Sequence, residues 1–596
     1  MRTWKLTFTA CLLMSLSAMA QQQSSSPQPA ASQATEAAQP ASAQARTANA
    51  STQQTVQAAP TTLDQVVDRA IEREQGLIKL LGERTPLIET YLQNLQNDPA
   101  NGPVPVADHY FLGRLDLQGD KGPSRRDYLD LDKSLESKLL GGVKSSVNKL
   151  YKFEYNPMGF SWMVFADRDA FDKEHYEFHY AHREFLGDVR TIVFDVTPKK
   201  GAGKGRFQGR IWVEDQEYNI VRLNGTYVPR PRNAQFFHMD SWRLNLVPGY
   251  WVPAYIYSEE GDFSYGSKDK LAFKAQSRIW GYDLKNGDKA DELTQVLVDS
   301  VKDESAAAAD ASPLQAQREW QQQAEDNVID RLQKCGLLAP PGEVDKVLDT
   351  VVTNLEVTNN ISLPRPVRAR VMITSPLETF SVGNTIIVSR GLVDVLPDEG
   401  SLAMVLSHEL AHIVLGHNLG SKYAFNDRML FSDESTYNNL GFKHIPEEET
   451  AADAKALELL KASPYAQKLQ VAGLFLRQLQ ARGPAIGALL TAHLGNNFTT
   501  KEGQVSRLTA VMNDAPALEN DKLDQIAALP LGGRVKINAW DDAAELVKTA
   551  PVAITSARDK MPLEVTPFFP RLTRLTGGGP APTPTTASTS APASTN

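Results

Sequence analysis

Cysteine is almost absent from this sequence. The 596 residues include only Cys11 and Cys335, and Cys11 lies within an N-terminal stretch that has the features of a cleaved leader. A mature chain with a single thiol cannot close an intramolecular disulfide. Zinc fingers, thiolate clusters and chemistry based on cysteine pairs are excluded by the same count. Any metal site in this chain must therefore be built from histidine and carboxylate side chains.

Long apolar runs are also absent. A membrane-spanning helix needs about 20 consecutive apolar residues, and the best candidate after the leader, residues 402–416, is interrupted by His408, Glu409 and His412. Excess positive charge is missing as well, since 62 basic and 71 acidic residues give a formal net charge of −9. Such an acidic chain is a poor binder of nucleic acid. We therefore expect no transmembrane span in the mature chain and no nucleic-acid partner.

The N-terminus has the features of a secretory signal peptide. Residues 1–20 combine Arg2 and Lys5 with an apolar stretch, and they end in the small-residue site Ala-Met-Ala at residues 18–20. A lipoprotein anchor at Cys11 is the less favoured alternative, because the apolar core that precedes it is too short. We expect an exported protein of the bacterial periplasm, or one that lies peripheral to the outer membrane.

The spacing of apolar residues changes along the chain. Between Leu63 and Leu95 the spacing is helical, which predicts a helical segment in two pieces that restarts at Pro86. From about residue 108 to residue 281 apolar and polar residues alternate, which predicts an antiparallel β domain. Pro253 should place its strand at an edge of the sheet, because proline cannot donate to a ladder of hydrogen bonds.

The motif with the clearest chemistry is Ser-His-Glu-Leu-Ala-His at residues 407–412. Positions i and i+4 share one face of a helix, so His408 and His412 can present two imidazoles to one metal ion. Glu409 would then lie beside a water that the ion activates. There it could take a proton from this water and pass it to the departing amine of a cleaved peptide bond. The alternative is a pair of core histidines that bind no metal.

Such an ion needs a third protein ligand. A metzincin places a third histidine ten residues after the first, where this chain has Asn418. The other known arrangement takes a glutamate from a later helix, and three glutamates follow Pro446. Glu449 is the favoured ligand, because Asp453 one turn further on could support a ligand imidazole. Glu448 is the fallback ligand.

These residues resemble the HtpX, BepA and CAAX-prenyl-protease type of zinc metallopeptidase, which is peptidase family M48 among the gluzincins. The resemblance covers roughly residues 320–510 and rests on HELAH at residues 408–412 with His417, on ETAAD at residues 449–453, and on residues 384–392. It implies one Zn²⁺ per chain, held by His408, His412 and Glu449. It also implies that Glu409 acts as general base and acid.

The resemblance implies an edge strand beside the metal-binding helix, to which an extended substrate could add by main-chain hydrogen bonds. The residues expected in this strand are Thr385, Ile386, Ile387 and Val388. The family's later His-Pro element has no counterpart near residues 498–507, so the group that stabilises the transition state is unassigned. His493 is one substitute, although a solvent-facing or capping role is favoured. His417 is expected to be structural at the end of the metal-binding helix, and His444 to lie in a loop.

The β region is rich in aromatic residues, and it resembles, more weakly, the lipoprotein-carrier (LolA-like) half-barrel that holds acyl chains in an apolar concavity. The aromatic residues could equally fill an ordinary sandwich core. This resemblance implies lipoproteins or acyl chains as additional partners of the β domain.

The expected fold class is multidomain α+β, with an antiparallel β half-barrel or sandwich followed by a mainly helical zincin metallopeptidase domain that contains a small edge-strand sheet. Segments rich in Gln, Ser, Ala, Pro, Thr or Gly are predicted to be disordered. The expected parts are a signal peptide (1–20), a disordered linker (21–60), a helical segment (61–100), the β domain (101–300), a helical connector (301–340), the metallopeptidase domain (341–530), a C-terminal extension (531–575) and a disordered tail (576–596).

From the sequence we therefore expect an exported zinc endopeptidase that hydrolyses unfolded or misassembled proteins of the cell envelope, with the β domain as recruiter. The alternative is a carrier or chaperone of hydrophobic or lipidated cargo whose zinc domain is latent or structural. The two hypotheses make different predictions for Glu409→Gln, which should abolish cleavage and leave a carrier function unchanged.

Overall fold

The structure is a computed structural model that describes most of the chain after residue 59. The described residues are 60–99, 101–116, 124–127, 162–229, 237–264, 270–282, 313–417, 437, 440–532, 534–537, 544–547 and 554–575. The predicted signal peptide, almost all of the linker and the C-terminal tail lie outside this part of the chain. None of the helices in the described part is long and apolar enough to cross a membrane.

The described residues 60–282 include helix α1 and a ten-stranded antiparallel sheet with the strand order β3-β2-β1-β10-β9-β8-β7-β6-β5-β4. The sheet is open and single, so the predicted antiparallel β domain is confirmed and a two-sheet sandwich is not formed. Its elements are α1 (Leu63–Gly82), β1 (Leu87–Asp98), β2 (Gly102–Asp116), β3 (Ser124–Asp127), η2 (Trp162–Val164), β4 (Tyr176–Leu186), β5 (Val189–Pro198), β6 (Arg206–Glu214), β7 (Ile220–Val228), β8 (Met239–Val247), β9 (Tyr250–Ser264) and β10 (Lys270–Trp280).

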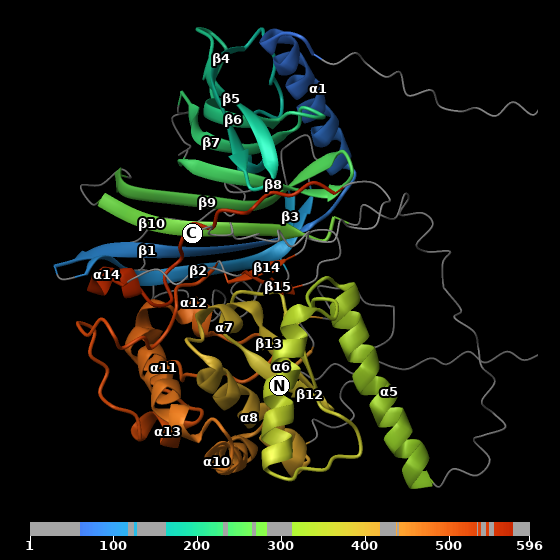
Figure 1. Ribbon diagram of the computed structural model, residues 1–596, viewed down its shortest axis with the longest axis vertical. Helices are drawn as coiled ribbons and strands as arrows, with labels where there is room; N and C mark the ends of the chain where they lie inside the picture. The colour runs from blue at the N-terminus through green and yellow to red at the C-terminus, as the bar shows by residue number, and fades with distance from the viewer. Residues whose placement is uncertain are drawn as a thin grey trace, which may run out of the picture. The chain divides into compact units, whose positions relative to one another are not determined.

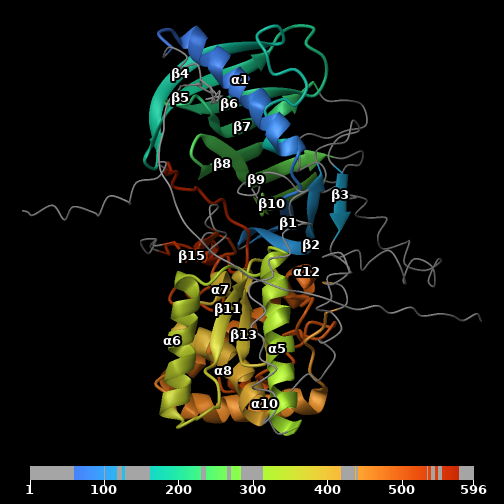
Figure 2. The same ribbon diagram turned by 90° about the vertical axis from the view of Figure 1, so that its right-hand side faces the viewer.

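Helix α1 covers one face of this sheet (Figures 1 and 2). It begins at a capping box in which Thr62 accepts a hydrogen bond from the Gln65 amide, and its apolar side packs against inward-facing residues of the strands. The helix also carries Glu74, which forms a fully buried, two-pronged ion pair with Arg243 of β8 at 2.6 and 2.8 Å. Arg243 donates further bonds to the carbonyls of Val164 and Ile220. One charged contact thus pins the helix to the sheet.

The second half of the prediction for residues 61–100 was wrong. Residues 87–98 form strand β1, not a helix, and β1 pairs with β2 on one side and with β10 on the other. A central strand that is buried on both faces carries apolar residues without clean alternation. Leu87, Tyr91 and Leu92 therefore mimic helical spacing although they belong to a strand.

Pro253 also lies where it was not expected. Strand β9 is an interior strand that pairs with both β8 and β10. Proline is tolerated there because the register with β8 shifts between Trp242 and Arg243, next to the Arg243–Pro253 pair. An irregular ladder of this kind does not need the missing N–H donor.

The second half of the chain is mainly helical with a three-stranded sheet. Its elements are α5 (Pro313–Lys334), α6 (Glu343–Thr358), β11 (Arg368–Met372), β12 (Thr379–Val382), β13 (Thr385–Ser389), α7 (Arg390–Val395), α8 (Glu399–Leu415), α10 (Pro446–Lys461), η4 (Ala466–Lys468), α11 (Leu469–Arg482), η5 (Gly483–Ala485), α12 (Gly487–Leu490), α13 (Thr509–Asn513), β14 (Val535–Ile537), β15 (Ala544–Leu546) and α14 (Ala557–Lys560). Helix α6 packs against β11, its neighbour in Figure 2, and α8 packs against β12.

The predicted edge strand is in the middle of this small sheet. Residues 385–388 belong to β13, which pairs in parallel with β11 and antiparallel with β12. All of its main-chain partners lie within the sheet, so β13 cannot accept a further strand. Both β11 and β12 are outer strands of the described sheet. The outer side of β11 is bridged by Leu338, whereas no described strand is paired on the outer side of β12, which precedes β13 by a two-residue turn. The expected edge role therefore passes from Thr385–Val388 to β12.

Buried polar contacts join the large sheet to the helical half. Glu89 of β1 accepts hydrogen bonds from the Ser375 hydroxyl at 2.9 Å and from the Arg390 guanidinium at 2.7 Å. Asp108 of β2 accepts bonds from the amides of Ala488 and Leu489 at 2.9 and 2.8 Å. Each contact joins a strand of the large sheet to a residue of the helical half, so together they hold the two halves against each other.

We predict that Glu74→Gln destabilises the protein by about 3–5 kcal/mol, because Arg243 would remain buried without its carboxylate. Glu72→Gln, on the exposed side of the same helix, should change stability by less than about 0.5 kcal/mol. The measurement is the urea midpoint of tryptophan fluorescence for the parent and both variants. Equal midpoints for the two variants would contradict the prediction.

Candidate metal centre

Helix α8 carries the HELAH motif. It begins at Asp398, whose side chain accepts a hydrogen bond from the Ser401 amide, and it ends at Gly416 in the left-handed conformation (φ 70°). Nearly every residue from 400 to 412 is buried, so the helix is surrounded by the core. Such a setting holds the His408 and His412 side chains in fixed positions.

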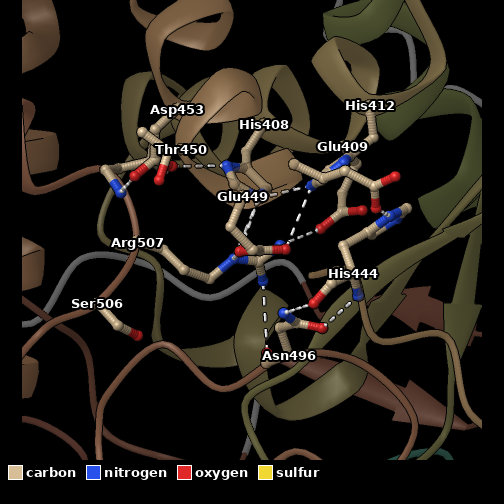
Figure 3. Close-up of polar contacts among 12 residues, drawn as sticks. His408, Glu409, His412, His444, Glu449, Thr450, Asp453, Asn496, Ser506 and Arg507 are labelled. Atoms are coloured by element: carbon tan, nitrogen blue, oxygen red, sulfur yellow. Dashed lines mark hydrogen bonds and ion pairs between the residues drawn. The ribbon is translucent and has the colours of Figure 1, made fainter. Parts of the chain in front are cut away.

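The structure brings His408, His412 and Glu449 together (Figure 3). The Nε2 atoms of the two histidines lie 3.1 Å apart, and Glu449 oxygens lie 3.5 Å from His408 Nε2 and 3.3 Å from His412 Nε2. Around a tetrahedral zinc with bonds of about 2.0–2.1 Å, two ligand atoms are separated by about 3.3 Å. The three side chains therefore fit a zinc ion in both chemistry and spacing.

Asp453 lies one turn after Glu449 on α10, which begins with Pro446 at its first position. The Asp453 Oδ1 atom is 2.9 Å from His408 Nδ1, on the side of the imidazole away from the cluster. The other oxygen accepts the Leu508 amide at 2.7 Å. A carboxylate in this position favours the ring orientation and the tautomer whose Nε2 lone pair can bind a metal. In the structure this Nε2 accepts a hydrogen bond from Arg507 Nε at 3.1 Å.

Glu448, the fallback ligand, does not reach the cluster. Its Oε2 atom lies 2.9 Å from Nδ1 of His444, which precedes α10. The His444 ring stacks on His412 with a centroid separation of 3.8 Å, and its main chain is held by two hydrogen bonds with Asn496 (Figure 3). His417 lies directly beyond the end of α8, with Nδ1 3.0 Å from His412 Nδ1. His444, which was expected to lie in a loop, thus packs against the candidate ligand His412.

Arg507 was not among the site residues predicted from the sequence. Its side chain is buried, and its guanidinium donates to Glu409 Oε1 at 2.7 Å and lies 3.1 Å from Glu449 Oε2 (Figure 3). The next residue, Leu508, has a left-handed backbone (φ 55°), which is unusual for a branched side chain. This conformation turns the chain so that Arg507 points at the cluster while the Leu508 amide reaches Asp453. Spacing could not reveal this residue, because it enters from a loop far along the chain.

Glu409 has one satisfied and one orphaned oxygen. Oε1 accepts from Arg507, whereas Oε2 is buried and has no hydrogen-bond partner among the described residues. A buried carboxylate oxygen without a partner is costly. A water beside the candidate ligands would satisfy it, which is the position that a general base requires.

The charges of the cluster are mutually compensated. Burial raises the pKa of Glu449, but Arg507 and the two histidines outweigh burial and hold the pKa well below its usual range. Burial and Arg507 lower the pKa of His408, whereas Asp453 and Glu449 raise it and prevail. Burial lowers the pKa of His412 and keeps its imidazole neutral, as metal binding requires.

A buried carboxylate organises the segment that holds His444. Oε2 of Glu378, which directly precedes β12, accepts hydrogen bonds from the amides of His493, Leu494 and Gly495. His493 is therefore placed by its main chain, and its ring stacks on Tyr110 of β2 with a centroid separation of 5.6 Å. No contact between the His493 ring and the metal cluster is found in the described residues.

Comparison with known protein families agrees with this geometry. Residues 344–493 match peptidase family M48, and this similarity supports a metallopeptidase. No curated protein matches the chain. Among solved structures, a domain from Vibrio parahaemolyticus described as an outer membrane lipoprotein-sorting protein is 13% identical, with a TM-score of 0.18, and the match covers 38% of this chain and 96% of that one.

We predict that Asp453→Ala weakens zinc binding by roughly 10- to 100-fold, because His408 would lose the partner that orients its ring. Glu458→Ala on the exposed side of the same helix serves as the control, since Glu458 contacts only Lys455. Zinc affinity is measured by competition with a chromophoric chelator. Unchanged affinity in Asp453→Ala would show that this carboxylate does not support the ligand.

Glu378 should make stability depend on pH. Burial raises its pKa to about 7 although three amides oppose the shift. Between pH 4.5 and 7 the Glu378 carboxyl therefore keeps its proton in the folded state, whereas the unfolded chain has lost it. The free energy of unfolding of the parent is highest below pH 4.5 in this respect, and it falls as the pH rises to about 7. Glu378→Gln should therefore gain stability relative to the parent between pH 4.5 and 7, by up to on the order of 3 kcal/mol. Denaturation midpoints at several pH values test this, and a constant difference between parent and variant would refute it.

Proposed function

We propose that this chain is a zinc-dependent endopeptidase that hydrolyses peptide bonds in extended polypeptides. The single observation that carries the proposal is the convergence of His408, His412 and Glu449 within 4.8 Å of one another, beside Glu409. Two imidazoles and a carboxylate are the ligand set of a catalytic zinc with an open position. The family match over the same region supports the same reading.

Each residue of the cluster has a role that follows from its contacts. Zn²⁺ held by the three ligands would act as a Lewis acid toward a water and the substrate carbonyl. The orphaned oxygen of Glu409 accepts the proton of the attacking water and delivers it to the leaving amine nitrogen. Asp453 holds His408 in the ligating orientation.

Arg507 supplies a fixed positive charge beside the reacting groups. Its guanidinium is buried between Glu409 and Glu449, and these carboxylates outweigh burial and raise its pKa. It holds the general base in place, and it offers N–H donors where negative charge develops on the substrate carbonyl oxygen. Arg507 therefore fills the role that the missing His-Pro element left open.

The substrate is expected to bind as an extended chain along β12. This strand packs against α8 and has an edge to which no strand is paired in the described sheet. Pairing through main-chain hydrogen bonds tolerates many side chains, which suits unfolded or misassembled proteins. Together with the leader at residues 1–20, this supports cell-envelope proteins as substrates and export to the periplasm as the location.

The carrier alternative gains no specific support. Its apolar concavity would have to be the sheet face opposite the helical half, and α1 packs against this face at β7 and β9. The Glu74–Arg243 pair further secures α1 there. A carrier role would require this helix to leave.

The decisive experiment compares the full chain with Glu409→Gln for zinc content and for cleavage of an unfolded protein. Both forms should hold about one zinc, and the variant should lose roughly 10²- to 10⁴-fold in rate, because the proton acceptor is gone while the ligands remain. A chelator should abolish parental cleavage, and added Zn²⁺ should restore it. Glu448→Gln, next to the ligand but outside the cluster, is the control. Cleavage by Glu409→Gln at the parental rate would refute the mechanism.

A further inference from the structure

The C-terminal part of the described chain crosses the large sheet on the face opposite α1. We call residues 563–575 the strap; their sequence is Leu-Glu-Val-Thr-Pro-Phe-Phe-Pro-Arg-Leu-Thr-Arg-Leu. The strap follows the red end of the chain across the strands in Figures 1 and 2. It contacts, in turn, strands β1, β10, β9 and β8, and then the turns that follow β6 and β4.

The sheet holds the strap by its main chain. Gln93 of β1 donates to the carbonyl of Leu563 and accepts from the amide of Val565, both at 2.8 Å. The Tyr255 hydroxyl repeats this pattern, because it donates to Thr566 O at 3.5 Å and accepts from Phe568 N at 3.2 Å. Each clamp spans residues i and i+2, as needed to grip an extended chain regardless of its side chains.

Aromatic side chains cover the middle of the strap. Phe568 packs edge-on against Tyr255, and Phe569 packs edge-on against Trp242. Arg222 lies 4.4 Å from the centroids of both Trp212 and Trp242, which forms an aromatic row with a cation inserted. Prolines stand on both sides of the two phenylalanines, so this stretch is restrained toward an extended backbone that fits an aromatic surface.

The last part of the strap binds an acidic corner of the sheet. Arg574 lies 2.8 Å from Glu214 and 3.1 Å from Asp215, and Arg571 pairs with Asp188 at the β4–β5 turn. The Asp188 amide donates to Leu572 O at 2.8 Å. This approach requires glycine at position 187, because a Cβ there would lie 2.6 Å from the Leu572 main chain and the backbone is left-handed (φ 69°).

We propose that this sheet face is a binding site for an extended polypeptide in which a proline-flanked aromatic pair is followed by arginine, and that the strap occupies the site in cis. The site combines main-chain clamps, an aromatic row and an acidic corner, which together define its ligand class. The strap is not one of the ten strands of the large sheet, and outside that sheet Val565 forms an isolated bridge with Leu531. Phe569 is 61% exposed, whereas Leu563, Val565 and Leu572 are buried, so the strap is anchored by apolar side chains as well as by its main chain.

The inference does not rest on the proposed peptidase activity, because its test measures binding. A fluorescein-labelled peptide with the sequence of residues 563–575 is titrated into the full chain and into a strap-weakened full chain, Phe569→Ala with Arg574→Gln. The strap in cis competes at an effective concentration in the millimolar range, so weakening it should raise peptide affinity by roughly tenfold or more. Adding Tyr255→Phe, which removes one clamp without changing ring size, should reverse the gain.

Two matched controls exclude a general loss of structure. Phe185→Ala removes a phenylalanine of β4 that is 67% exposed and has no contact with the strap, and Arg210→Gln removes an arginine that pairs with Asp195. The double variant of these two should bind the peptide no better than the parent. Absence of saturable binding to a folded strap-weakened chain would overturn the proposal.

Hydrogen exchange on the unmodified chain decides the question if the weakened variant does not fold. The amides of Val565, Phe568 and Leu575 donate hydrogen bonds to side chains of the sheet. Exchange of the Phe568 and Leu575 amides through a local opening, at least tenfold faster than the amides of β8 and β9, supports a strap that can be displaced. Exchange of all these amides together with those strands would show that the strap is a fixed part of the fold and would overturn the proposal.

Discussion

The candidate metal centre depends on ionisable side chains that are carried by helix α8, which is surrounded by the hydrophobic core. A charge in such surroundings is tolerated only when it is paired and hydrogen-bonded. Glu409 and Glu449 are compensated by Arg507, and His408 by Asp453 on its outer side. This compensation explains why the elements that meet here come from three distant parts of the chain: α8, α10 and the loop after residue 496. Oε2 of Glu409 and Oε1 of Glu449 have no hydrogen-bond partner among the described residues, so the cluster can accept a further polar group.

What could be foreseen from the sequence was local in origin. The spacing of His408 and His412 puts both on one helix face, and the same rule relates Glu449 to Asp453. The contributions of Arg507 and His444 could not be foreseen, because their positions result from how loops fold back on the helices. His493 shows the converse case, since proximity in sequence to the expected His-Pro element did not bring its ring into the cluster.

The fold predicted from the sequence was wrong where strand pairing, and not the spacing of apolar residues, determines the structure. Strand β1 is buried on both faces because Leu87 and Tyr91 lie in one core cluster and Ile88 and Leu92 in the other, and Pro253 is accommodated by a shift in register. The order of β11, β13 and β12 could not be deduced either, since a short apolar strand does not reveal which neighbour it will have. The antiparallel β domain, the helices and the small sheet were predictable because alternation and helical spacing persist over many residues.

The edge of β12 and the strap face share one physical logic. In both proposals an extended polypeptide would bind through main-chain groups, which tolerates many different side chains. Discrimination must then come from the few side-chain contacts beside the main chain, which on the strap face are the aromatic row and the acidic corner. A chain with this arrangement can accept many unfolded partners at the candidate metal centre. Its preference among them would be set on the sheet, at residues separate from those that perform the chemistry.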